Sequence, residues 1–103
     1  MQYQGFTNWH TWYIYILIQQ EKKVYDLRRA VKDRWNPRMA RKFCHAMNDD
    51  GYLERMDTDF RFQEVDWTDV ARQFQEDADE WAEYELWEKS VPFKDQEVLL
   101  HRR

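Results

Sequence analysis

The sequence has only two glycines, two prolines and one cysteine among its 103 residues. So few turn-forming residues argue against a sandwich of many short strands, which needs frequent tight turns. A single cysteine, Cys44, leaves no pair for an internal disulfide and suits a reducing compartment. The longest apolar run, Trp12 to Ile18, has seven residues, whereas a membrane-spanning helix needs about 20. Because the N-terminus also shows no secretory signal, we expect a cytoplasmic protein that does not enter a membrane.

Motifs for catalysis or cofactor binding are missing as well. Two glycines cannot build a phosphate-binding loop of the known types. The three histidines, His10, His45 and His101, do not form the close pairs that are typical of zinc sites. Cys44 and His45 are adjacent, and neighbours on a helix point about 100° apart, so they cannot face each other. We therefore expect no enzymatic activity, no cofactor and no metal site.

Aromatic residues, in contrast, are abundant: six Trp, six Tyr and six Phe make up 17% of the chain. Each large ring can bury about 150–250 Å², so a short chain can fill a core with few positions. The length is that of one domain. We expect a single helical domain over residues 1–103, in which residues 91–103 form a partly ordered tail.

Hydrophobic spacing and capping residues predict a mainly α fold, a compact bundle of about four helices. The expected ranges are 8–20, 22–35, 37–48 and 66–89. Asn8 (or Thr7) can cap the first of them, Asn36 the third and Asp66 the fourth. Alternation at residues 59–63 leaves a short strand there as an alternative to a loop.

The apolar faces of two of these helices follow helical spacing. In the range 22–35 the expected buried residues are Val24, Leu27, Val31 and Trp35. In the range 66–89 they are Trp67, Val70, Ala71, Phe74, Ala78 and Trp81. Three acids fall towards this second stripe, and we expect them to pair with Arg28 or Arg34: Asp77, Glu85 and Glu88.

Charge divides the chain into two unlike halves. Residues 1–48 contain nine Lys/Arg and three Asp/Glu, a balance of +6, whereas residues 49–103 contain seven and seventeen, a balance of −10. The total of −4 conceals this division. Such asymmetry indicates either a surface for a charged partner or attraction between the halves within the fold.

Two surfaces are candidates for binding. On the helix at 66–89, one face opposite the apolar stripe is acidic and carries one large ring: Asp69, Glu76, Asp79, Glu80, Glu83 and Trp87. This face can imitate a nucleic-acid backbone or dock on a basic cleft, or it is merely a solvated surface. A basic flank on the second and third helices could follow a phosphate backbone, or pair within the fold: Tyr25, Arg28, Arg29, Lys32, Arg34, Arg38, Arg41 and Lys42.

The opening residues 5–12, GFTNWHTW, are followed by the apolar run Ile16-Leu17-Ile18. This opening resembles a family of small uncharacterised proteins, encoded mostly by bacteriophages and related mobile elements, that begin roughly Gly-aromatic-x-Asn-aromatic-Glu-Thr-Trp. Val65-Asp66-Trp67 is similar to an element that opens a later acidic helix in that family. This chain departs at His10, where the family tends to have Glu, and at Leu17, where it tends to have Trp. The family has no assigned activity, so the resemblance implies only a viral origin.

The leading hypothesis is a small non-enzymatic, phage-type protein that acts in the host cytoplasm. It would bind a host protein with a basic surface through its acidic face, and would inhibit or redirect it. A nucleic-acid-handling defence factor is one such target, because its phosphate-binding site is lined with Lys and Arg. The alternative is a nucleic-acid-associated accessory protein that uses the basic flank. An exposed tryptophan-rich patch could equally be a homodimer interface.

Overall fold

The computed structural model of the chain describes residues 5–53 and 56–90. The described part forms α1 (Trp9–Gln20), α2 (Lys22–Arg29), α3 (Pro37–Asp49), a short 3₁₀ helix η1 (Phe62–Glu64) and α4 (Trp67–Ser90). The predicted mainly helical fold of four helices is confirmed. None of the helices described is long and apolar enough to cross a membrane. The predicted tail at 91–103 lies outside the described residues.

Polar residues begin three of the helices, as their sequence positions predict. Each capping side-chain oxygen accepts a hydrogen bond from the backbone N–H three residues later: Asn8 from Thr11 at 2.9 Å, Asn36 from Met39 at 2.9 Å, and Asp66 from Asp69 at 3.2 Å. These bonds satisfy amides that have no partner within the helix. α3 ends at Asp49, and Gly51 turns the chain away just after it: its φ of +84° suits glycine, and its N–H donates to the Asn48 carbonyl at 3.1 Å.

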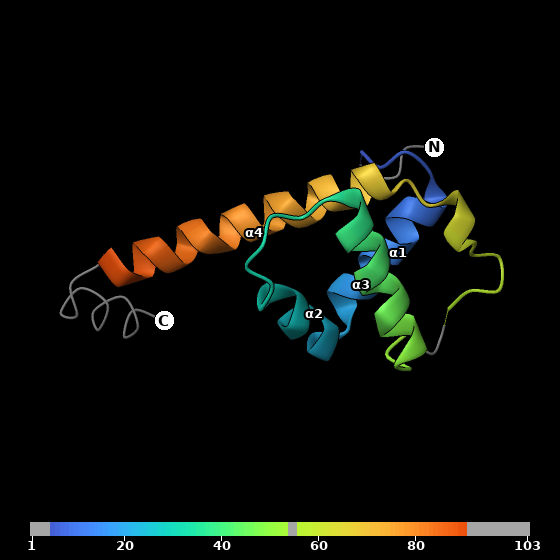
Figure 1. The fold of residues 1–103 in the computed structure, drawn as a ribbon, viewed down its shortest axis with the longest axis horizontal. Coiled ribbons are helices and arrows are strands. Elements are labelled where there is room, and N and C mark those ends of the chain that lie inside the picture. Colours follow the sequence, from blue (N-terminus) through green and yellow to red (C-terminus); the bar gives the residue numbers. More distant parts are fainter. Residues whose placement is uncertain (1–4, 54–55, 91–103) are drawn as a thin grey trace, which may run out of the picture.

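The other helices are gathered around the first half of α4. α3 and α1 both pack on α4, and α1 also packs on α2. Figure 1 shows α1, α2 and α3 gathered at the N-terminal end of α4, while the C-terminal half of α4 runs out beyond them. All residues from 86 to 90 are exposed. The bundle therefore surrounds only about half of its longest helix.

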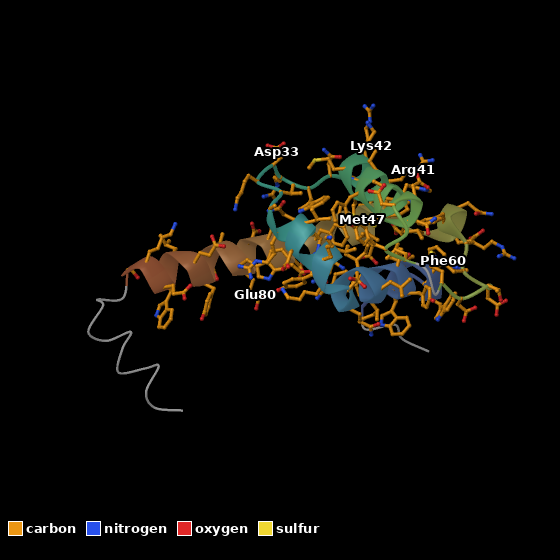
Figure 2. All side chains as sticks on the ribbon, turned by 90° about the horizontal axis from the view of Figure 1, so that it is seen from below. Asp33, Arg41, Lys42, Met47, Phe60 and Glu80 are labelled. Atoms are coloured by element: carbon orange, nitrogen blue, oxygen red, sulfur yellow. The ribbon has the colours of Figure 1, made fainter. Side chains whose placement is uncertain are left out.

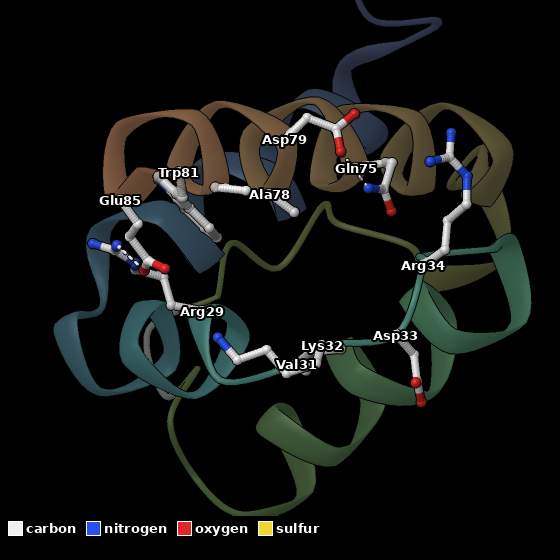
Figure 3. A pocket seen from close by; sticks show the side chains of 11 residues that line it. Arg29, Val31, Lys32, Asp33, Arg34, Gln75, Ala78, Asp79, Trp81 and Glu85 are labelled. Carbon is white, nitrogen blue, oxygen red and sulfur yellow. Dashed lines mark hydrogen bonds and ion pairs between the residues drawn. The ribbon is translucent and has the colours of Figure 1, made fainter. Parts of the chain in front are cut away.

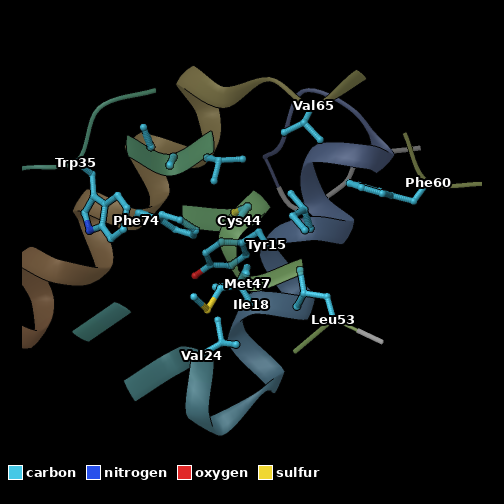
Figure 4. Packing of buried hydrophobic residues seen from close by; sticks show 14 residues of the cluster. Tyr15, Ile18, Val24, Trp35, Cys44, Met47, Leu53, Phe60, Val65 and Phe74 are labelled. Carbon is cyan, nitrogen blue, oxygen red and sulfur yellow. The ribbon is translucent and has the colours of Figure 1, made fainter. Parts of the chain in front are cut away.

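The core draws its apolar side chains from all four α-helices. Ile14, Ile18, Val24 and Phe74 are completely buried. Figure 4 shows Ile18, Val24 and Phe74 within this cluster. Trp35, which lies between α2 and α3, packs edge-on against Phe74 with ring centroids 5.0 Å apart. Burial of such side chains contributes about 1.5–3 kcal/mol each, which makes this cluster the main source of stability.

The second helix is shorter than predicted, because it ends at Arg29 instead of continuing to residue 35. Residues 31–36 are irregular. Asn36 must be extended, since it caps α3 and precedes Pro37, and Trp35 gains contacts that a longer helix would forbid. The Trp35 N–H donates to Gln75 Oε1 at 2.7 Å. Leu27, expected on the buried face, is 41% exposed.

The short strand that was one alternative for residues 59–63 does not form. Residues 62–64 make the 3₁₀ helix η1, and the Arg61 N–H donates to His10 Nδ1 at 3.1 Å. The alternation of Phe60 and Phe62 has another cause. Phe60 is buried in the core, whereas Phe62 stacks on His45 of α3 at a centroid distance of 4.2 Å.

The buried stripe of α4 also differs in part from the prediction. Val70, Ala71 and Phe74 are buried, as expected. The other three expected residues, Trp67, Ala78 and Trp81, are only half-buried. Two acids, Asp69 and Asp77, are buried instead. Asp77 was expected towards this stripe, whereas Asp69 was expected on the exposed acidic face. The burial of Asp69 depends in part on Thr7, which lies 62 residues away in the sequence.

Candidate interaction surfaces

Arg28 lies at the centre of a buried polar cluster. Its side chain has no solvent exposure, and its Nη1 is 2.9 Å from Asp77 Oδ2. The hydroxyl of Tyr15 donates to the same Asp77 oxygen at 2.7 Å. The Arg28 guanidinium also lies over the rings of Phe74 and Trp81, with centroid distances of 4.5 and 4.8 Å. Arg28, predicted as part of a nucleic-acid surface, is therefore inaccessible, and its expected pairing with Asp77 is confirmed.

The same cluster controls the protonation of Tyr15. Burial raises the pKa of the Tyr15 hydroxyl, and its hydrogen bond to the charged Asp77 raises this pKa further. The hydroxyl therefore stays protonated and acts as the hydrogen-bond donor to Asp77. Asp77 Oδ1 accepts a third bond, from Gln73 Nε2 at 3.1 Å. Both oxygens of the buried carboxylate are thus occupied within the protein, which makes the cluster a link between α1, α2 and α4.

Asp69, predicted on the acidic face, is instead a structural residue. It accepts hydrogen bonds from the Thr7 N–H at 2.9 Å and from Arg72 Nη2 at 2.5 Å. Burial by itself would raise the pKa of Asp69, but the bonds from Arg72 and Thr7 outweigh burial and lower it. Asp69 stays charged and ties the segment before α1 to the first turn of α4. A surface partner would not reach it.

The remaining acids of the predicted face are exposed. Glu76 pairs with Arg72 at 3.1 Å, and Asp79 accepts from Gln75 at 2.8 Å. Farther along α4 the exposed acids are Glu80 and Glu83.

Large apolar side chains lie beside these acids. Trp87 is 50% exposed, Tyr84 58% and Leu86 70%. The rings of Tyr84 and Trp87 have centroids 6.0 Å apart. The sequence pattern indicated Trp87 but not Tyr84 or Leu86. The spacing of Tyr84, three residues before Trp87, was the signal available.

The predicted basic flank separates into a paired part and an exposed part. Tyr25 packs edge-on against Trp81 at 5.2 Å. Glu85, which was expected to pair with Arg28 or Arg34, instead pairs with Arg29 at 3.2 Å. The other predicted cations are exposed and make no ion pair within the described residues: Lys32, Arg34, Arg38, Arg41 and Lys42. Figure 2 shows Arg41 and Lys42 extending from α3 away from the body.

One cavity of about 220 Å³ lies between the irregular segment after α2 and α4. Figure 3 shows Lys32 and Arg34 on one side of it, and Gln75 and Asp79 on the other. Charges of both signs face each other across this space. The cavity therefore has no dominant charge to select a ligand.

A second cavity, of about 450 Å³, is lined mainly by rings and one cation. Its residues are Arg41, His45, Phe62, Gln63, Val65 and Trp67. The rings of Phe62 and Trp67 are nearly parallel, 16° apart, with centroids separated by 6.3 Å. The sequence did not indicate this site, since Phe62 was expected in a loop or a short strand, and Trp67 in the buried stripe of α4.

The metal-ligand residues and the cysteine of the described part, residues 5–53 and 56–90, are dispersed or buried. No group of three or more His, Cys, Asp or Glu side chains there is placed to hold a metal ion. Cys44 is completely buried, and burial raises the pKa of its thiol, so the nucleophilic thiolate is disfavoured. A scan against protein-family models found no matching family, and searches of curated proteins and of solved structures found no matching chain.

Proposed function

We propose that this chain is a non-enzymatic binding protein whose α4 docks on a basic surface of a partner protein. The observation that supports this is the exposure of three large side chains on the projecting half of α4. Tyr84, Leu86 and Trp87 are between 50% and 70% exposed, and the acids Glu80 and Glu83 flank them. Exposed apolar groups bordered by charge are typical of interaction sites.

The two kinds of side chain have different roles in docking. Trp and Tyr are the residues that most often carry binding energy at interfaces, because they bury much area with few rotatable bonds. Carboxylates around them speed and orient the approach of a basic partner. The helix presents this surface clear of the body (Figure 1), so a groove on a partner can enclose it from more than one side.

The nature of the partner follows from the acidic charge and from the resemblance of residues 5–12 to small bacteriophage proteins. A phage protein made in an infected cell meets host proteins, and those that handle nucleic acid expose clefts rich in Lys and Arg. The proposed activity is therefore stoichiometric inhibition or redirection of a host nucleic-acid-handling protein, such as a defence factor. Docking of α4 would block the cleft.

Site-specific crosslinking tests this proposal. A photoreactive amino acid at position 86, on the projecting half of α4, should crosslink one host protein with a basic cleft, whereas the same group at Asp49 of α3 should not. The crosslinked protein is identified by mass spectrometry, and its affinity for the purified chain is then measured by calorimetry. Crosslinking from position 49 but not from position 86 would contradict the proposal.

Charge reversal supplies the matched comparison. The triple variant Glu76→Lys, Glu80→Lys and Glu83→Lys, and separately Trp87→Ala, should weaken binding of the identified partner about 30-fold or more, the loss expected at a hot spot. The control reverses three exposed acids elsewhere: Asp33→Lys, Asp49→Lys and Asp59→Lys. Equal affinities for the two triple variants would show that the acidic face has no specific role.

A further inference from the structure

The rings of the second cavity form a partly exposed aromatic platform at the end of the molecule opposite the projecting half of α4. His45, Phe62 and Trp67 are each half-buried. His45 stacks on Phe62 with centroids 4.2 Å apart, and Phe60 packs edge-on against Phe62 with centroids 5.0 Å apart. These neighbours fix the platform before any ligand arrives, so little side-chain freedom is lost when a flat group stacks on it.

A row of cations on α3 leads to this platform. Arg38, Arg41 and Lys42 lie three and four residues apart, a spacing that places them on one side of the helix. All three are exposed and without an ion pair among the residues described, and Arg41 also lines the cavity with the rings. Such unneutralised charges favour an anionic ligand.

The acids on the projecting half of α4 lie far from the rings of this cavity. Glu80 is 13 residues beyond Trp67, about 20 Å along the helix at 1.5 Å per residue. That distance exceeds twice the Debye length of about 8 Å at physiological salt. Of the nearer carboxylates, Asp69 pairs with Arg72 Nη2 at 2.5 Å, and Asp66 accepts a hydrogen bond from the Thr7 hydroxyl at 2.9 Å. They are thus already engaged within the fold.

From this combination we propose that the second cavity binds single-stranded nucleic acid. Phe62, Trp67 and His45 stack on the bases, while Arg41 and its neighbours on α3 contact the phosphates. A single strand fits better than a duplex, because paired bases are stacked on each other and cannot offer their faces to protein rings. The site is distinct from the docking surface of α4, so the two proposals can fail separately.

Fluorescence anisotropy with labelled dT12 and U12 tests the proposal at low salt. We expect micromolar binding of at least one of the two strands that weakens as salt rises. An abasic strand with the same phosphates should bind at least about fivefold more weakly, since it offers nothing to stack. Equal binding of the abasic strand, stronger binding of a 12-base-pair duplex, or no binding of either single strand would overturn the proposal.

Variants locate the site. Phe62→Leu and Trp67→Leu keep an apolar side chain but remove the ring, and each should weaken binding of the single strand about fivefold or more. Arg41→Gln should weaken binding and reduce its salt dependence. The controls are Trp87→Leu, an exposed ring on the projecting half of α4, and Lys22→Gln, an exposed cation on α2; both should bind as the parent does. Equal losses in the controls would overturn the assignment.

Photocrosslinking locates the site in the unmodified protein, so it remains informative if a variant fails to fold. Strands carrying 5-iodouracil are irradiated with the unmodified protein, and the crosslinked peptides are identified by mass spectrometry. Crosslinks at Phe62, His45 or Trp67 are expected. Crosslinks confined to Trp81, Tyr84 or Trp87 would place the strand elsewhere and would overturn the proposal, while leaving the docking function of α4 to its own test.

Discussion

A buried ion pair depends on both of its members, and Arg28 shows this at the scale of a single residue. Substitution Arg28→Met leaves the Asp77 carboxylate charged and without its cation in the core. We expect the free energy of unfolding, measured by urea denaturation, to fall by about 3–5 kcal/mol. Adding Asp77→Asn removes the uncompensated charge and keeps an acceptor for the Tyr15 hydroxyl.

The double variant should therefore be more stable than Arg28→Met alone, by about 1–3 kcal/mol. With Asp77→Asn alone as the fourth protein, the comparison forms a double-mutant cycle, in which the two changes are not additive because the side chains touch. A double variant that is less stable than Arg28→Met would show that the charge of Asp77 is not what destabilises the single variant.

Two other buried residues, Cys44 and Tyr15, make the free energy of unfolding depend on pH in the alkaline range. Their pKa values are raised in the folded state, first by burial and, for Tyr15, also by Asp77. In the unfolded chain the thiol loses its proton near pH 8.5 and the phenol near pH 10. Above these values the unfolded state binds fewer protons than the folded state, so the free energy of unfolding decreases as pH rises.

Urea denaturation between about pH 8 and about pH 11 measures this decrease, expected to approach 1.4 kcal/mol per pH unit for each ionised group. Tyr15→Phe removes one of the two groups and should make the decline shallower above about pH 10. Tyr84→Phe, at an exposed tyrosine, should leave the slope as in the parent. A slope unaffected by Tyr15→Phe would contradict the assignment.

At the scale of the element, helix starts were predictable from the sequence and helix ends less so. Asn8, Asn36 and Asp66 each cap a helix through a hydrogen bond to a residue only three positions later. The neighbouring sequence is therefore enough to predict these caps. The end of α2 depends on Trp35, which packs on Phe74, 39 residues away in the sequence. Because Trp35 also fits helical spacing from Val24, the pattern predicted a longer helix.

In the candidate sites, too, features set by local sequence were predictable and features set by distant contacts were not. The exposed acids of α4 were predictable, because a helical wheel needs only the spacing of charges. The burial of Asp69 was not, since it depends on Thr7, 62 residues away in the sequence. The aromatic cavity likewise joins His45 of α3 to Phe62 and Trp67, and no local pattern connects these positions.

The long helix α4 consists of two parts that should differ in local stability. Val70, Ala71 and Phe74 are buried in the core, whereas all residues from 86 to 90 are exposed. Amide hydrogen exchange should therefore be slow at residues 70–77 and fast at residues 86–89, which can open without unfolding the core. Equally slow exchange in both parts would mean that a second molecule covers the projecting half.

At the scale of the whole molecule, charge and exposed apolar surface act against each other. The surface around Tyr84, Leu86 and Trp87 favours contact between two copies, but Glu80 and Glu83 on each copy repel. The chain carries a net charge of −4, which adds to this repulsion. The predicted homodimer thus depends on how far salt screens the acids.

Sedimentation velocity in low and high salt decides this balance. At about 50 mM salt the Debye length exceeds 10 Å, so repulsion persists and we expect a monomer at micromolar concentration. At about 0.5 M salt screening is short-ranged, and contact through the exposed side chains should produce a measurable fraction of dimer. Leu86→Glu should abolish that dimer, whereas Leu27→Glu, at another exposed leucine, should not. Association that instead weakens with salt would indicate contact between the acidic end of one copy and the basic α3 of another, which is an open, head-to-tail arrangement.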